Sequence, residues 1–158
     1  MIHQIEAGKT EAKCPSALVL APTRELANQV SRELEELSQL KGVKILAVYG
    51  GVSLQKQAEH LQEGVDIIVG TPGRLLDQVR RKNLDLSKVK TITLDEADEM
   101  LSMGFWDDVT EILGMTSEGR QTMFFSATLP YAIAKAAAEF LKEPERIDLS
   151  GDILTVEG

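Results

Sequence analysis

Five short apolar segments alternate with amphipathic segments along the 158 residues of the chain, and this alternation constrains the fold most strongly. The apolar segments are 17–22, 44–50, 65–70, 90–96 and 122–128, with a weaker sixth candidate at 146–150. Their nearly continuous apolar character is typical of strands that are buried on both faces, as in a parallel sheet. Strands that alternate with helices form β-α-β units, so the pattern predicts an α/β fold.

Helices are expected between these strands, over 23–41, from Ser53 to Gly64, from Thr71-Pro72 onward, over 106–113 and over 130–141. The longest carries Leu26, Val30, Leu34 and Leu37 at spacings of four, four and three, which predicts one inner face. Strand order cannot be deduced from this pattern.

The charge balance limits how such a chain can bind nucleic acid. It has 17 Lys and Arg against 25 Asp and Glu, which gives a net charge of −8. A long-range field of this sign repels polyanions, so binding would require a local basic patch. Aromatic residues make up only 4% of the chain, which disfavours base stacking as the main binding mode.

The single cysteine, Cys14, excludes an intrachain disulfide and a thiolate metal cluster. An inert free thiol in a reducing compartment is the favoured interpretation, so we expect a cytoplasmic protein. No apolar run approaches the ~20 residues that span a membrane, so no membrane partner is expected.

Two adjacent carboxylates follow the strand candidate 90–96 within the sequence ITLDEADEM. Asp95 suits a Mg²⁺ site, because this ion takes few protein carboxylates and keeps most of its waters. Glu96 could orient an attacking water or accept a proton from it. The alternative is that Asp-Glu after a strand forms a solvated turn, which is the better interpretation for an isolated pair.

The sequences APTRELA and TPGRLL share one arrangement, in which Pro and Thr follow a strand and an Arg lies in the first turn of a helix. Free N–H groups, a positive dipole end, a hydroxyl and a guanidinium together favour a phosphate site that ignores base identity. Simple helix capping, with Arg24 and Arg74 as surface charges, is the alternative. Gly50-Gly51 would allow close approach of a nucleic-acid strand, or form an ordinary turn.

The sequence FFSATLP places two hydroxyls, Ser126 and Thr128, after another strand. They could bond to the Asp98 side chain and couple the carboxylate site to another part of the molecule. Locally, a capping role at the helix that begins near Pro130 is favoured.

Taken together, APTRELA, GG, TPGR, DEAD and SAT, in this order and at these separations, resemble the DEAD-box ATP-dependent RNA helicases. The resemblance is to their first RecA-like domain and covers about residues 17–149. It implies a RecA-like three-layer sandwich with a mostly parallel sheet, and ATP and Mg²⁺ as ligands of the parent protein. A non-enzymatic module that binds an RNA backbone or a protein, and a related DNA helicase, are the alternatives.

The resemblance also implies roles for individual residues. Asp95 would hold Mg²⁺ through water, Glu96 would position the hydrolytic water, and Asp98 would bond to Ser126 and Thr128 to couple nucleotide state to unwinding. The path of single-stranded RNA would be lined by Pro22, Thr23, Arg24, Gly50, Gly51, Thr71, Pro72, Gly73 and Arg74. A second RecA-like domain would be the partner within the parent chain.

The tripeptide Gly8-Lys9-Thr10 looks like the end of the family's phosphate-binding loop, A-x-T-G-x-G-K-T. Aligned on Lys9, however, Glu6 would replace a phosphate-cradling glycine, no strand precedes the tripeptide, and no full-length helix can follow it. We therefore interpret residues 1–16 as the end of a helix and a variable connection, with the true loop absent and Lys9 a coincidence.

This interpretation predicts a domain core over 17–150 and the start of an interdomain linker over 151–158. The sheet would lack its first strand, so the chain would fold with a gap, rearrange, or associate with another copy through an exposed edge. The isolated chain is expected to bind ATP very weakly, with no nucleotide or Mg²⁺ retained, and to be inactive.

Overall fold

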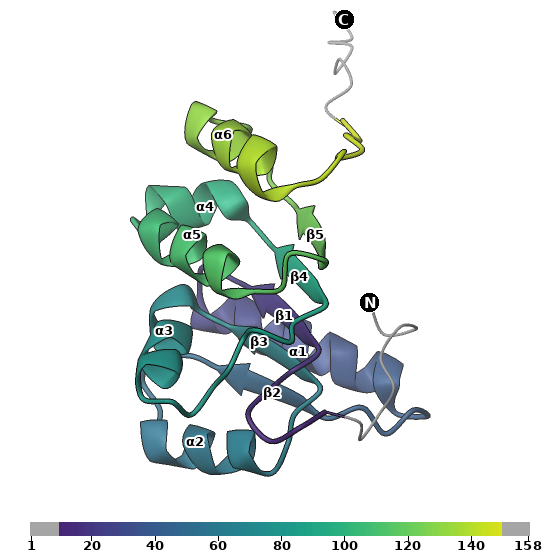
Figure 1. Ribbon diagram of the computed structural model, residues 1–158, viewed down its shortest axis with the longest axis vertical. Coiled ribbons are helices and arrows are strands. Elements are labelled where there is room, and N and C mark those ends of the chain that lie inside the picture. The colour runs from purple at the N-terminus through teal and green to yellow at the C-terminus, as the bar shows by residue number, and fades with distance from the viewer. Residues whose placement is uncertain (1–9, 150–158) are drawn as a thin grey trace, which may run out of the picture.

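The computed structural model describes residues 10–149, and five strands form one parallel sheet at its centre (Figure 1). The strands are β1 (Ala17–Leu20), β2 (Ile45–Val48), β3 (Ile67–Gly70), β4 (Thr91–Leu94) and β5 (Gln121–Phe124). Their order in the sheet is β2-β3-β1-β4-β5, and every neighbouring pair is parallel. Neighbours are hydrogen-bonded throughout, so the described part of the sheet has no gap.

Six helices alternate with these strands in the described part of the chain. They are α1 (Arg24–Ser38), α2 (Leu54–Gln62), α3 (Pro72–Arg80), α4 (Ala97–Ser102), α5 (Trp106–Met115) and α6 (Tyr131–Phe140). The predicted α/β fold with a parallel sheet is confirmed. The helices within residues 10–149 are all too short or too polar to cross a membrane.

The two faces of the sheet bury different helices, which gives a three-layer sandwich (Figure 1). Leu18, Ile68 and Ile92 lie level in the parallel register and pack with side chains from α2 to α6. Val19 and Val69 alternate to the opposite face, where they pack with side chains of α1. Period-two alternation within each strand therefore supplies both cores from one apolar run.

Burial is uneven across the sheet. β1, β3 and β4 are buried along their whole length, as the apolar runs predict. β2 and β5 lie at the two edges and are only partly buried. Continuous apolar character therefore indicates two-sided burial only for the three inner strands.

Three details differ from the sequence-based expectations. The strand predicted at 146–150 is wrong over 146–149, where the chain is irregular and its apolar side chains are exposed. Leu37 does not join the inner face of α1, because it is 73% exposed near the end of the helix. α4 was not predicted, since it is only six residues long and begins within the DEAD sequence, at Ala97.

Residues 10–16 connect to the sheet without a helix or strand of their own. The Thr10 hydroxyl donates a hydrogen bond to Asp66 at 2.6 Å, just before β3 begins. The helix end expected over 1–8 and the linker expected over 151–158 lie outside the described residues, as does Ser150. That the sheet lacks a first strand remains a prediction.

Candidate functional site

The strand order gathers the five polar sequences singled out above along one edge of the sheet. Each begins within two residues of the carboxyl end of a strand, and parallel strands end at a common edge. Along that edge the order is YGG, TPGR, PTREL, DEAD and SAT, after β2, β3, β1, β4 and β5 respectively. The arginine sequences thus occupy neighbouring strands, and the carboxylate and hydroxyl sequences occupy the next pair.

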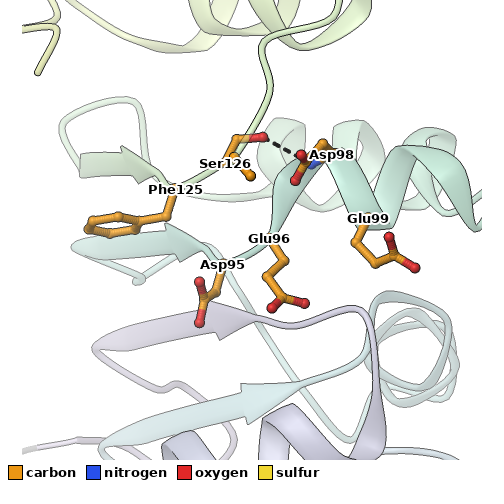
Figure 2. Close-up of a pocket in the computed structure, with 7 residues that line it drawn as sticks. Asp95, Glu96, Asp98, Glu99, Phe125 and Ser126 are labelled. Atoms are coloured by element: carbon orange, nitrogen blue, oxygen red, sulfur yellow. Dashed lines mark hydrogen bonds between the residues drawn. The ribbon is translucent and has the colours of Figure 1, made fainter. Parts of the chain in front are cut away.

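A hollow of about 350 Å³ lies at the ends of β4 and β5. It is lined by Asp95, Glu96, Asp98, Glu99, Phe125, Ser126 and Ala127. Figure 2 shows the Asp95 and Glu96 side chains projecting in a similar direction, away from Ser126, while Asp98 lies beside Ser126. The backbone N–H of Asp95 donates to the Leu20 carbonyl at 3.0 Å, which ties the backbone of this residue to the ladder between β4 and β1.

Glu96 adopts a left-handed backbone conformation, with φ 51° and ψ 54°, immediately before α4. A residue with a Cβ atom in this region costs about 1–2 kcal/mol. The helix that follows stabilises this conformation, because the Glu96 carbonyl accepts hydrogen bonds from Glu99 N and Met100 N. The sharp turn leaves the Glu96 side chain exposed in the hollow instead of packed against the sheet.

Asp98 links the β4 end to the β5 end. Its Oδ2 atom accepts hydrogen bonds from Thr128 N at 2.9 Å and from the Thr128 hydroxyl at 2.8 Å. The Ser126 hydroxyl accepts a bond from Asp98 N at 3.2 Å and donates to the Thr128 carbonyl. Neither hydroxyl caps α6, which has no side-chain cap, so the capping role favoured for them is wrong.

These bonds also set the charge of Asp98. Partial desolvation acts to raise its pKa, but hydrogen bonds from Thr128 and Ser126 outweigh this effect and hold the pKa of Asp98 below its ordinary value. The hydrogen bonds therefore favour the ionised form of Asp98.

The donor set at the hollow fits a Mg²⁺ ion held through water. Within residues 10–149 there is no cluster of three or more His, Cys, Asp and Glu side chains that could cage a metal. Adjacent carboxylates at a strand end, open to solvent on one side, match an ion that retains several waters. Asp95, which directly follows β4, is the residue for which contact with that hydration shell is predicted.

The start of α1 carries the first arginine sequence. Thr23 is the N-cap, and its hydroxyl accepts a hydrogen bond from Leu26 N at 3.2 Å, so its capping role is confirmed. Pro22 is buried, so it shapes the entry to the helix and does not present a side chain to a ligand. Arg24 is exposed, and its guanidinium carbon lies 5.1 Å from the centre of the Tyr49 ring.

The start of α3 carries the second arginine sequence. Thr71 is extended at the N-cap but makes no side-chain capping bond, and Pro72 is buried in the first turn. Gly73 is half-buried near the Asp108 carboxylate. Arg74 Nη1 donates to the Val52 carbonyl at 3.0 Å and to Gln57 Oε1 at 3.1 Å.

Gly50 and Gly51 lie exposed between β2 and α2, close to both arginines. Gly51 has a φ of +81°, which favours glycine, and a Cβ atom there would lie 3.5 Å from Arg24 Nη1. The structure therefore brings together Thr23, Arg24, the glycine pair, Thr71 and Arg74 at one end of the sheet edge.

Sequence reasoning missed Tyr49 and Gln57, which join the two arginine sequences. A signal for Gln57 existed, since it is a polar residue three positions after Leu54 and four before Leu61 on the inner side of a helix. Tyr49 belonged to the strand-end sequence YGG, but only the two glycines of that sequence were given a role.

Thr10, the one residue of the Gly8-Lys9-Thr10 tripeptide that the structure describes, lies away from this edge. Thr10 bonds to Asp66, which precedes β3, whereas Asp95 and Glu96 follow β4. The two positions are at opposite ends of parallel strands, which supports the interpretation that the tripeptide is not a phosphate loop for this site.

Comparison with known proteins decides the family. The model of the "DEAD/DEAH box helicase" family matches residues 1–136. The chain belongs to the DEAD/DEAH box helicase family. It is 49% identical over 153 residues to the DEAD-box ATP-dependent RNA helicase CshA of Streptococcus pneumoniae, which covers 97% of this chain and 29% of that protein.

Other helicases of this family match similarly. The ATP-dependent RNA helicase DeaD of Escherichia coli is 49% identical over 146 residues, or 92% of this chain and 23% of that protein. The chain therefore spans less than a third of the length of these relatives.

A solved structure confirms the RecA-like fold of this helicase domain. The crystal structure of a DEAD box protein from Methanococcus jannaschii superposes with a TM-score of 0.84 and 41% sequence identity, over 90% of this chain and 38% of that one. The resemblance inferred from the five motifs is confirmed.

Proposed function

We propose that this chain is the first RecA-like domain of an ATP-dependent RNA helicase, in which ATP hydrolysis is coupled to RNA binding and local duplex unwinding. The observation that carries the proposal is the bonding of Asp98 to Thr128 and Ser126 beside the carboxylates at β4. A stand-alone binding module would not need that arrangement. The names of the relatives, ATP-dependent RNA helicases, support it.

The proposed chemistry of the carboxylates follows from their position. Bound ATP with its Mg²⁺ would supply the phosphoryl group that is transferred to water. Asp95 would hold the hydration shell of the ion, and Glu96 would orient the attacking water and take its proton. The left-handed backbone at Glu96 keeps its carboxylate in the hollow, beside Asp95.

The proposed RNA grip lies at the other end of the same edge. Arg24 and Arg74, the amide groups at the starts of α1 and α3, and the Gly50-Gly51 loop would contact sugar and phosphate without reading bases. This local cationic cluster offsets a net charge of −8, which would otherwise repel RNA. Pro22 and Pro72 would act by fixing the helix starts, since both are buried.

Activity is proposed for the full-length protein and not for this chain alone. A second RecA-like domain would complete the ATP site, so the isolated chain would bind ATP weakly and not hydrolyse it.

We also propose that the isolated chain associates with itself through the free side of β5. Its oligomeric state can be measured by sedimentation equilibrium. A cytoplasmic location remains our proposal for the parent protein.

The test is RNA-stimulated ATPase activity of the full-length protein and of the isolated chain. We expect the full-length protein to hydrolyse ATP, and Glu96→Gln to lower its kcat by at least about a hundredfold, the usual contribution of a positioned general base. Thermal unfolding should be unchanged, because Gln has the same shape and position 96 is exposed.

Glu99→Gln is the matched control, because it removes a neighbouring carboxylate from the same hollow. It should retain most of the activity. A full-length protein with no RNA-stimulated turnover would contradict the proposed function. Appreciable turnover by the isolated chain, abolished by Glu96→Gln, would contradict the need for a second domain.

A further inference from the structure

Gln57 is a polar side chain on the inner side of α2, and only 5% of it is exposed. Its Nε2 atom donates a hydrogen bond to the Tyr49 carbonyl at 3.1 Å, and its Oε1 atom accepts one from Arg74 Nη1 at 3.1 Å. A carbonyl oxygen only accepts and a guanidinium only donates, so a single orientation of the amide satisfies both partners. The position therefore specifies glutamine chemically.

Gln57 holds one end of the loop that contains the glycine pair directly and the other end through Arg74. The amide holds the loop at Tyr49, and Arg74 holds it at the Val52 carbonyl, 3.0 Å away. Between these two points lie Gly50 and Gly51, whose backbones have the widest conformational freedom of any residue. Gln57 thus restrains both this glycine-containing loop and the rotamer of Arg74.

Tyr49 extends the same set of contacts to α1. Its hydroxyl donates to Asn28 Oδ1 at 2.9 Å, and its ring lies under the Arg24 guanidinium. Arg24, Tyr49, Gln57 and Arg74 therefore form a continuous series of contacts that joins the ends of β1, β2 and β3. We call these four residues the edge network.

We infer that Gln57 is a positioning residue for RNA binding, and that the edge network makes three separate backbone-contacting sequences act as one rigid surface. The inference rests on the proposed function, because it assumes that Arg24 and Arg74 contact phosphate. Binding to a surface that is already ordered avoids the entropy cost of immobilising long side chains and a glycine loop. Gln57 itself is buried and does not touch the nucleic acid.

The test uses the full-length protein and a labelled single-stranded RNA oligonucleotide of mixed sequence, over a series of salt concentrations. Gln57→Met keeps the length of the side chain and removes both hydrogen bonds. We expect it to weaken RNA binding about fivefold to tenfold and to make the slope of log K against log salt shallower. The change in slope should be up to about 0.7, which corresponds to one phosphate that the protein no longer neutralises.

Gln78→Met is the matched control. Gln78 is also buried, and it bonds to the Leu54 carbonyl and to Asn83 instead of to an arginine. It should lower thermal stability to a similar extent while leaving the salt slope of RNA binding unchanged. A role of Gln57 in folding alone would make the two variants behave alike, which would overturn the inference.

Coupling to Arg74 gives the second measurement. Arg74→Ala should weaken RNA binding similarly for all sequences, and adding Gln57→Met to it should have little further effect, because both changes release the same contact. If Arg74→Ala weakens binding and Gln57→Met does not, the RNA grip stands and the positioning role is wrong. If Arg74→Ala has no effect, the proposed grip is wrong and the inference fails with it.

A third variant covers the case in which Gln57→Met does not fold. Gln57→Glu keeps the size and polarity of the side chain but pairs a carboxylate with Arg74 and repels the Tyr49 carbonyl. We expect weaker RNA binding and a shallower salt slope, since the Arg74 charge is then neutralised within the protein. Wild-type affinity and slope in this variant would overturn the inference.

Discussion

Asp98 illustrates how a single carboxylate can connect two strand ends. It lies in the first turn of α4, yet its acceptor atom is filled by the backbone and hydroxyl of Thr128, thirty residues further along the chain. Any change that displaces Thr128 must break a hydrogen bond to an ionised group. In the proposed function, this contact would transmit the state of the carboxylate site to the segment that leads into α6.

The lowered pKa of Asp98 predicts a pH-dependent contribution to stability. A carboxyl group whose folded pKa is depressed stabilises the fold above its unfolded pKa of about 3.9, and this contribution is lost as the pH falls through the folded value. We expect Asp98→Asn to lower the free energy of unfolding at pH 7 by up to about 1 kcal/mol, because the group is largely solvated. The difference from wild type should shrink below pH 4.

Urea unfolding of the chain at pH 7, 5 and 3.5 measures this difference, with Glu99→Gln as the control for loss of one negative charge in the same helix. Glu99 has no contact with Thr128 among the bonds of the described residues. A stability loss in Asp98→Asn that is equal at all three pH values would show that the charge of Asp98 is not responsible.

At the scale of helices and strands, hydrophobic periodicity was a better guide to the structure than local turn geometry. All five strong strand candidates are strands and all five predicted helices exist, because apolar runs and helical spacing are both visible in the sequence. Only the three inner strands are also buried along their whole length. The convergence of the motifs at one edge also follows from parallel strands. The order β2-β3-β1-β4-β5 does not, because strand neighbours are chosen by packing between segments far apart in the chain.

The parts of the site that escaped prediction have specific physical causes. The left-handed turn at Glu96 is invisible because the residue that adopts it is not a glycine. The link from Gln57 to Arg74 joins two helices, and the link from Tyr49 to Asn28 joins a strand end to a helix. Such contacts depend on the tertiary arrangement, and no spacing rule within one element reveals them.

Gly70 gives a prediction at the level of strand and helix packing. A Cβ atom at this position would lie 2.6 Å from the Val48 carbonyl and 3.0 Å from Leu75, so β2 and α3 leave no room for a side chain. We expect Gly70→Ala to lower the free energy of unfolding by about 3 kcal/mol, since the interior cannot absorb the overlap without moving backbone.

Gly114→Ala is the control, because Gly114 lies in α5 with open space around its Cβ position. It should leave stability unchanged or raise it by about 0.5–1 kcal/mol, the ordinary gain from alanine in a helix. Both are measured by urea unfolding. Equal unfolding midpoints for Gly70→Ala and wild type would contradict the packing argument.

The distribution of charge and the sheet edge belong to the whole molecule. A net charge of −8 coexists with an arginine cluster at one end of the strand-end edge, so the proposed RNA surface is local. The other end of the sheet is different in character. Within the described residues β5 has a neighbour on one side only, and Phe125, Leu129 and Tyr131 are exposed beside it.

Hydrogen bonding identifies which groups of β5 face outward. Gln121 N and Phe125 N donate to the carbonyls of Lys90 and Leu94, both at 2.8 Å. Since donors alternate along a strand, the N–H groups of Thr122 and Phe124 point to the free side. An exposed strand edge with apolar neighbours is a template for pairing, and two identical edges can pair about a two-fold axis.

Thr122→Pro therefore tests the proposed self-association of the isolated chain. Proline removes an outward N–H group and leaves the bonds to β4 intact, so we expect association to weaken at least about tenfold in sedimentation equilibrium. Thr122→Val keeps the donor and removes a hydroxyl that is buried without a hydrogen-bond partner, so it should associate like wild type and be slightly more stable.

Two outcomes would contradict pairing through β5: a wild-type chain that stays monomeric at all concentrations, or equal association of the Thr122→Pro and Thr122→Val variants. The longer relatives extend well beyond the region matched here. Thr122→Pro in the full-length protein therefore tests whether the β5 edge is also free there or is covered by another part of the protein. If Thr122→Pro does not change the association of the full-length protein, the β5 edge is free only in the isolated chain.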